Sequence, residues 1–304
     1  TIGNMSAIRL GTRASTLATT QSEMVARLLR SEGLDVDLTT ITTHGDTSTA
    51  SLAAMGGIGV FASAIRATLL KGEADIAVHS FKDLPTGRPL GLAIGAVPAR
   101  ADPRDALVAR DGLTLHDLPQ EASVGTGSPR RAAQLLAVRP DLTIVDIRGN
   151  VDTRLGRVKG LGHYAKGGGK EDLDAVVLAA SGLARLGHSG AVTEFLDPSV
   201  VLPAPAQGAL AVECRTADSR HGKLAKALAR IDDRRTRLAA TAERAVLSHL
   251  EAGCAAPIGA LAQLKPVSGS SPQVLTLDVV VATVDGSRIC LLYTSPSPRD
   301  LSTS

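Results

Sequence analysis

The chain alternates between short apolar segments typical of strands and longer segments typical of helices, and this alternation is what most constrains its fold. In its first third the predicted strands are residues 7–10, 36–41, 74–78 and 92–97. The predicted helices between them are residues 16–30 and 60–70. The first helix has an apolar stripe, and Ser15 precedes it as an N-cap residue. Strands that alternate with helices in this way favour a layered α/β architecture.

The same pattern begins again after Asp102-Pro103-Arg104-Asp105. Predicted strands follow at residues 123–125, 142–146, 175–179 and 209–213. Predicted helices begin at Ser128, with Pro129 in the first turn, and at Val151. The last part has predicted helices at 223–231 and 236–250 and a β-branched strand at 274–283. We therefore predict an α/β fold with two similar α/β domains and a small C-terminal α+β domain.

Composition narrows the functional classes. The 304 residues are 44% apolar, which is enough for more than one hydrophobic core. A net charge of +3 and only 2% aromatic residues argue against nucleic-acid binding. No apolar stretch reaches the length needed to cross a membrane, and no leader-like N-terminal segment is recognisable. The three cysteines, Cys214, Cys254 and Cys290, lack the spacing of a disulfide framework or a metal site. We expect a cytoplasmic protein without a bound metal.

Two residues in predicted loops suggest chemistry. Cys254 lies between the end of a helix and the start of a strand, although a lone cysteine is more often a small buried hydrophobe. Asp83 ends a polar turn, His79-Ser80-Phe81-Lys82-Asp83, that follows a buried type of strand. In that turn Lys82 can hold an anion while Asp83 exchanges protons with a bound amine or pyrrole N–H. The alternative is a surface turn with a simple Lys–Asp pair.

Arginines gather where predicted strands turn into helices. The chain has 25 Arg and 8 Lys, and arginine binds carboxylates through two parallel hydrogen bonds, although GC-rich coding also produces such a bias. Backbone N–H groups and the dipole at a helix N-terminus favour an anion as well. Three turns combine these features, and they contain Arg13 with Ser15, Ser128 with Arg130 and Arg131, and Arg148 with Arg154. Together with Cys254 and Asp83, they suggest a tethered polyanion processed by a single carboxylate.

Other common catalytic motifs are missing from the sequence. There is no phosphate-binding Walker loop, no Gly-x-Ser-x-Gly nucleophile turn, and no histidine pair at zinc-ligand spacing. Two functions remain open on the residues alone. The chain is either an enzyme that works on the tethered group, or a two-lobed protein that binds a small anion without chemistry.

A series of motifs in one order resembles the porphobilinogen deaminase family, also called the hydroxymethylbilane synthase family. The matching stretches are Ile8–Ser15, Ala77–Pro85, Asp102–Asp105, Val124–Arg131, Arg148–Asn150, Pro205–Gly208, and Gly253–Cys254 with Pro257–Gly259. They extend over roughly residues 7 to 289, so the resemblance is far more specific than any single motif.

The resemblance implies three domains, of which the first two are similar to the lobes of a periplasmic binding protein. Domain 1 is expected at residues 1–102 with 203–222, domain 2 at 103–202 and domain 3 at 223–289. Residues 290–304 read as the translation of a sequencing adapter, so we expect a non-native tail that replaces a truncated C-terminus.

The resemblance also implies a reaction. A dipyrromethane cofactor is joined to Cys254 by a thioether, four porphobilinogen molecules are added to it head to tail with loss of ammonia, and water releases hydroxymethylbilane. The resemblance assigns catalysis to Asp83 and implies a monomer. The implied cofactor-binding residues are Cys254, Lys82, Asp83, Ser128, Arg130, Arg131 and Arg154. The implied substrate-binding residues are Arg13, Ser15, Arg148, Arg154 and Gln207.

Overall fold

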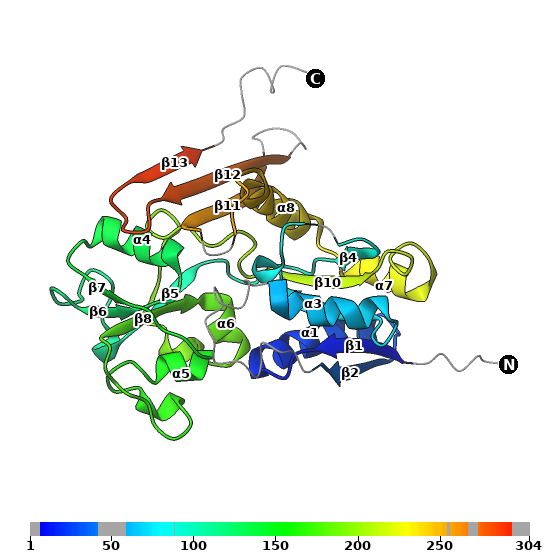
Figure 1. Ribbon diagram of the computed structural model, residues 1–304, viewed down its shortest axis with the longest axis horizontal. Helices are drawn as coiled ribbons and strands as arrows, with labels where there is room; N and C mark the ends of the chain where they lie inside the picture. Colours follow the sequence, from blue (N-terminus) through cyan, green and yellow to red (C-terminus); the bar gives the residue numbers. More distant parts are fainter. Residues whose placement is uncertain (1–6, 42–58, 88, 254–255, 267–272, 294–304) are drawn as a thin grey trace, which may run out of the picture. The chain divides into compact units, whose positions relative to one another are not determined.

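The structure, a computed structural model, describes residues 7–41, 59–87, 89–253, 256–266 and 273–293 (Figure 1). The chain divides into two compact units. The first contains Thr1–Ala101 and Ala209–Leu238, and the second contains Asp102–Gly208 and Ala239–Ser304. The chain therefore leaves the first unit, builds most of the second, and then returns.

The first unit is built on a five-stranded sheet with the order β2-β1-β3-β10-β4. Its strands are β1 (Ile8–Thr12), β2 (Val36–Thr40), β3 (Ile76–Ser80), β4 (Leu92–Ala96) and β10 (Leu210–Arg215). Its helices are α1 (Thr16–Ser31), α3 (Gly59–Leu70) and α7 (Gly222–Ile231). β1 runs parallel to β2 and β3, whereas the returning β10 is antiparallel to both β3 and β4.

Helices cover both faces of this sheet because successive strand residues point to opposite sides. On one face Ile76 and Val78 of β3 pack in a core cluster with Val25 and Leu29 of α1. On the other face Ala77 packs with residues of α3 in a second cluster. The central strand β3 is therefore fixed from both sides, and its carboxyl end, Ser80, leads directly into the turn at Phe81–Asp83.

The second unit contains a similar five-stranded sheet with the order β7-β6-β8-β5-β9. Its strands are β5 (Asp105–Ala109), β6 (Ser123–Gly125), β7 (Thr143–Val145), β8 (Ala175–Ala179) and β9 (Glu194–Phe195). Its helices are α4 (Pro129–Val138), α5 (Val151–Leu155) and α6 (Ala180–Arg185). β6 is parallel to β7 and β8, and β5 is antiparallel to β8 and β9.

The same unit also contains a three-stranded antiparallel sheet near the C-terminus (Figure 1). It consists of β11 (Ile258–Pro266), β12 (Gln273–Ala282) and β13 (Ile289–Tyr293), and it follows helix α8 (Arg234–His249). β11 lies against the segment before β10, since Ala260 N donates to Pro203 O at 2.9 Å. Gly259 permits this close approach, because a Cβ atom there would lie 2.7 Å from Leu202 O. Short 3-10 turns occur at Phe81–Asp83, Arg110–Gly112, Gly162–Tyr164 and Ser189–Ala191.

The predicted α/β class with a small C-terminal sheet is confirmed, and most predicted elements match within two residues. Four elements were not predicted, namely β5, α6, the short β9, and β13, which falls almost entirely in the segment expected to be a non-native tail. β5 is a run of five buried residues, so it has no alternation of apolar and polar positions that could reveal a strand. Among the described residues, no helix is long and apolar enough to cross a membrane.

Candidate functional site

In the first unit, the turn after β3 presents two polar side chains between two buried anchors. Phe81 and Leu84 are buried, whereas Lys82 between them is half-buried and Asp83 is exposed. Phe81 N donates to Ala209 O at 3.0 Å, which ties the turn to the residue before β10. The Asp83 carboxylate is thus held at the surface by a backbone that its neighbours fix.

Arg13 and Ser15 lie at the same edge of this sheet as Asp83. They follow β1, which is parallel to β3, and the carboxyl ends of parallel neighbouring strands meet at one edge. Ser15 is the N-cap of α1, as predicted, and its Oγ accepts a hydrogen bond from Ala18 N at 3.3 Å. Arg13 is half-buried just before this helix start. A cation, a helix N-terminus and the Asp83 carboxylate therefore share one strand edge.

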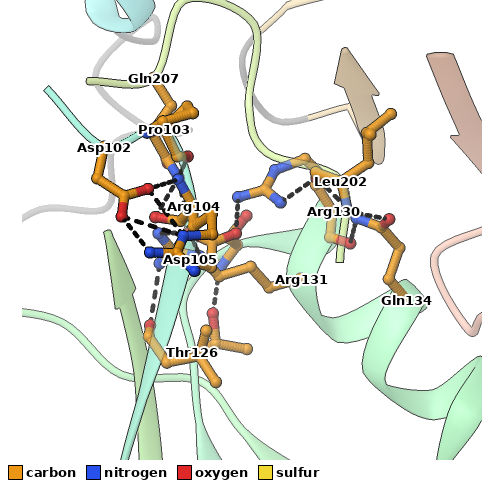
Figure 2. Close-up of polar contacts among 12 residues, drawn as sticks. Asp102, Pro103, Arg104, Asp105, Thr126, Arg130, Arg131, Gln134, Leu202 and Gln207 are labelled. Atoms are coloured by element: carbon orange, nitrogen blue, oxygen red, sulfur yellow. Dashed lines mark hydrogen bonds and ion pairs between the residues drawn. The ribbon is translucent and has the colours of Figure 1, made fainter. Parts of the chain in front are cut away.

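In the second unit, two consecutive arginines at the start of α4 converge on one buried carboxylate (Figure 2). Arg130 Nη2 lies 2.8 Å from Asp105 Oδ2. Arg131 Nε and Nη2 donate to Asp105 Oδ1 at 3.0 and 2.7 Å. All three side chains are almost entirely buried, and the group carries one net positive charge because one carboxylate faces two guanidinium groups.

Backbone carbonyls and an amide hold this group in place. Arg130 Nη1 donates to Leu202 O at 2.6 Å, and Arg131 Nη1 donates to Val177 O at 3.0 Å. Gln207 is fully buried, and its Nε2 donates to Asp105 Oδ1 and to a backbone carbonyl, both at 2.8 Å. In this arrangement the amide of Gln207 supports Asp105, and its expected contact with a substrate stays a prediction.

The charge of Asp105 depends on its arginines. Burial alone would raise the pKa of Asp105, but the charges of Arg130 and Arg131 hold that pKa well below its usual range. A carboxyl with a depressed pKa in the folded state stabilises the fold fully above the unfolded value, near pH 4. That contribution is lost as the pH falls below this value toward the pKa of the folded state.

Three loops of this unit bring arginines to one sheet edge. β6, β7 and β8 are parallel, so the residues that follow each strand lie at the same edge. Arg130 and Arg131 follow β6, Arg154 lies in α5 after β7, and Arg185 ends α6 after β8. Arg148, between β7 and α5, is largely exposed, with Nη2 3.5 Å from Asp146 Oδ2. Ser128 is the N-cap of α4, but its side chain makes no capping hydrogen bond.

Arg154 and Arg185 are half-buried and have few anionic partners among the described residues. Burial lowers the pKa of Arg154, and the nearby charge of Arg131 lowers it further. Burial also lowers the pKa of Arg185 to about 10. Among the described residues, Arg185 donates only to Gly208 O, at 2.7 Å, and its buried Nε has no hydrogen-bond partner. A buried cation without a counter-charge is costly, and a bound anion would remove that cost.

These observations fit an acidic ligand at this edge. The buried Nε of Arg130 is likewise without a hydrogen-bond partner among the described residues. The edge therefore combines surplus positive charge with unfilled donors, which suits the carboxylates of a dipyrromethane. No group of three or more His, Cys, Asp or Glu suited to a metal ion occurs in the described part of the chain.

Arg185 and Asp105 were not identified as site residues from sequence. Arg185 lies in α6, which the sequence pattern did not predict, so its position at the carboxyl end of a buried strand could not be predicted either. Asp105 ends the Asp102–Asp105 motif, but its role could not be predicted because its partners are 25 and 26 residues away in α4. Cys254 lies outside the described residues; α8 ends before it at His249, and β11 begins after it at Ile258.

Comparison with known sequences gives two family matches. A sequence model described as "Porphobilinogen deaminase, dipyromethane cofactor binding domain" matches residues 8–223. A second, described as "Porphobilinogen deaminase, C-terminal domain", matches residues 237–295.

Curated relatives agree with the family matches. The chain is 97% identical over 284 residues to porphobilinogen deaminase of Cutibacterium acnes, which covers 93% of this chain and 85% of that protein. It is 53% identical over 320 residues to the porphobilinogen deaminase of Micrococcus luteus, which covers 98% of this chain and 85% of that protein. Among solved structures, a methionine-bound nutrient-binding protein from Burkholderia cenocepacia is similar with a TM-score of 0.43 at 16% identity, covering 73% of this chain and 92% of that one.

Replacing the buried carboxylate should destabilise the second unit. Asp105→Asn leaves two buried guanidinium groups without a counter-charge, so we expect the free energy of unfolding to fall by about 3–5 kcal/mol. Asp102→Asn is the matched control, because Asp102 is half-exposed and pairs with Arg104 only two residues away. We expect a loss below about 1 kcal/mol there. Urea denaturation at pH 7 measures both, and equal losses would contradict the role of Asp105.

Proposed function

The chain belongs to the porphobilinogen deaminase family, and from that premise we propose which of its residues carry out the family's reaction. The protein is a transferase of tetrapyrrole and heme biosynthesis, hydroxymethylbilane synthase. It condenses four porphobilinogen molecules, with loss of ammonia, onto a dipyrromethane primer, and water then releases hydroxymethylbilane. The observation that carries our assignment of residues is the gathering of arginines at one strand edge in the second unit.

Cys254 forms the thioether to the dipyrromethane. Lys82, Ser128, Arg130, Arg131 and Arg154 bind the acetate and propionate groups of the cofactor. Three observations support this assignment. Asp105 with Arg130 and Arg131 carries a net positive charge, and the Ser128 hydroxyl makes no capping hydrogen bond. At the same edge the buried Nε atoms of Arg130 and Arg185 have no hydrogen-bond partner among the described residues. When bound, the dipyrromethane supplies the pyrrole carbon to which the first porphobilinogen is joined. We add Arg185 to the residues that bind these acidic groups, because it lacks a carboxylate partner among the described residues.

Asp83 is the catalytic residue. Its carboxyl group delivers a proton to the amine of porphobilinogen, so that ammonia leaves. The carboxylate that remains stabilises the positive charge developing on the substrate, and it then accepts the proton that the new pyrrole linkage releases. This assignment is supported by the anchored turn that exposes Asp83, because a fixed carboxylate needs little reorganisation during the reaction.

The incoming porphobilinogen binds through its two carboxylates. Arg13 and Ser15 contact it in the first unit, and Arg148 and Arg154 contact it in the second. The role of Arg13 is supported by its position at the sheet edge that also carries Asp83, and the role of Arg148 is supported by its exposure. Gln207 contributes indirectly, because its amide fixes Asp105. A non-catalytic anion-binding protein would need neither the thiol of Cys254 nor the proton transfer of Asp83.

We also propose the finer organisation. The chain has three domains, with β11 and β12 in the third, and it acts as a cytoplasmic monomer that needs no membrane or nucleic acid. Residues 290–304 are a non-native tail. The exposure of Leu291, Leu292 and Tyr293, between 50% and 69%, supports this, because apolar side chains selected for β13 would be buried.

Asp83→Asn should abolish most turnover without unfolding the protein. Asparagine cannot donate or accept the catalytic proton, so we expect kcat to fall by roughly 100-fold or more. Because the side chain is exposed, the thermal transition should stay within about 2 °C of wild type. Asp37→Asn, an exposed carboxylate on β2, is the matched control and should keep full activity. Wild-type turnover in Asp83→Asn would rule out the assignment.

The covalent tether predicts a specific mass. Purified protein should be heavier than its sequence by the mass of two linked pyrrole units, and Cys254→Ser should lose that increment entirely. Cys214→Ser is the control, because Cys214 is fully buried in the core of the first unit and should not affect the increment. Intact-mass spectrometry measures all three proteins. An unmodified Cys254 in active protein would disprove the tether.

A further inference from the structure

Two buried ionisable groups of the first unit have no part in the reaction as assigned. His79 lies on β3 four residues before Asp83, and Glu213 lies on the neighbouring β10. The side chain of Glu213 is 1% exposed and that of His79 is 9% exposed. Burying a carboxylate costs free energy, so a buried Glu213 next to β3, the strand that leads to Asp83, suggests a functional role.

The register of the sheet brings these side chains together. Glu213 pairs with Ala77, and His79 follows Ala77 by two residues, so both side chains point to the same face as diagonal neighbours. His79 Nε2 lies 3.4 Å from Glu213 Oε2. This is long for a hydrogen bond, and the buried Nε2 has no hydrogen-bond partner among the described residues. Glu213 Oε2 is therefore the carboxylate oxygen next to His79 Nε2, at a separation that a small movement of either side chain would shorten to a hydrogen bond.

Arg66 keeps the acceptor charged. It reaches this face from α3, and its Nε lies 3.1 Å from both carboxylate oxygens of Glu213, while Nη2 lies 3.0 Å from Oε1. Burial alone would raise the pKa of Glu213, but the nearby His79 and the guanidinium group of Arg66 hold that pKa below its usual range. A charged acceptor makes the stronger hydrogen bond to an imidazole N–H.

The opposite face of the same strand end is held by a different contact. Gln21 Nε2 of α1 donates to Ser80 Oγ at 2.9 Å. The two residues that precede the turn thus meet side chains on opposite faces, His79 lying beside Glu213 and Ser80 accepting from Gln21. A shift of about 1 Å in such a turn can reduce the rate by about two orders of magnitude.

We propose that Glu213 is a positioning residue of the reaction, which fixes the turn carrying Asp83 by accepting a hydrogen bond from His79 Nε2–H. Arg66 serves as the counter-ion that lets Glu213 remain charged in the core. The proposal rests on the assignment of Asp83 as the catalytic residue. It predicts that the acceptor at position 213, and not the charge of the pair, determines kcat.

The decisive comparison uses one background, Arg66→Met, and two changes at position 213. Glu213→Gln keeps an acceptor oxygen for His79, whereas Glu213→Met removes it with similar volume. Neither double variant leaves a buried charge unpaired, so both should unfold near the wild-type temperature. We expect kcat of the Met variant to be at least about tenfold below that of the Gln variant, with KM within about twofold. Equal kcat values would overturn the proposal.

A second pair leaves Glu213 and Arg66 intact, which keeps the test valid if the double variants do not fold. His79→Gln places an amide donor near the position of Nε2, and His79→Met removes the donor. We expect the Gln variant to recover at least about tenfold in kcat over the Met variant, with equal cofactor mass on both proteins. Equal kcat in this pair would also overturn the proposal. Asp83→Asn assayed in parallel separates the two claims, because its full activity would disprove the assignment of Asp83 alone.

Discussion

The arginine-rich sheet edge of the second unit depends on the buried ion pairs that Asp105 makes with Arg130 and Arg131. Two arginines in succession at a helix start cannot both be buried without a counter-charge, and Asp105 supplies it from the first residue of β5. Because one carboxylate balances two guanidinium groups, the group is rigid and still carries one positive charge. A fixed positive field of this kind attracts acidic groups without needing flexible side chains to reorganise.

The first unit uses a buried carboxylate in a comparable way. Glu213 on β10 forms an ion pair with Arg66 and lies beside His79 of β3, the strand that leads into the turn with Asp83. In each unit a buried acid lies beside basic side chains near the carboxyl edge of a sheet, while Asp83 and Arg148, which we propose act on substrate, are exposed. Positioning and binding are thus divided between different residues in this account, which explains why an anion-binding sheet edge contains buried carboxylates.

The sequence allowed prediction of features that depend on near neighbours. Ser15 caps α1 and Pro129 begins α4, because capping is decided within three or four residues. β5 could not be predicted, since a strand buried on both faces lacks alternation. The partners of Arg130, Arg131 and Gln207 were also out of reach, because they are set by strand order over separations of 25 to 102 residues. The motif resemblance predicted a role for Asp83, and the contacts that hold its turn became visible only in three dimensions.

The central claim is that this chain builds a pyrrole polymer on its own thiol. The most direct test is intact-mass spectrometry of the protein after brief exposure to isotopically labelled porphobilinogen. The account predicts a ladder of protein masses above the resting cofactor-bearing form, with steps of one labelled pyrrole unit and no more than four steps, and no ladder for Asp83→Asn. A single unchanged mass for the wild-type protein, with porphobilinogen bound reversibly, would contradict the account and favour a binding protein.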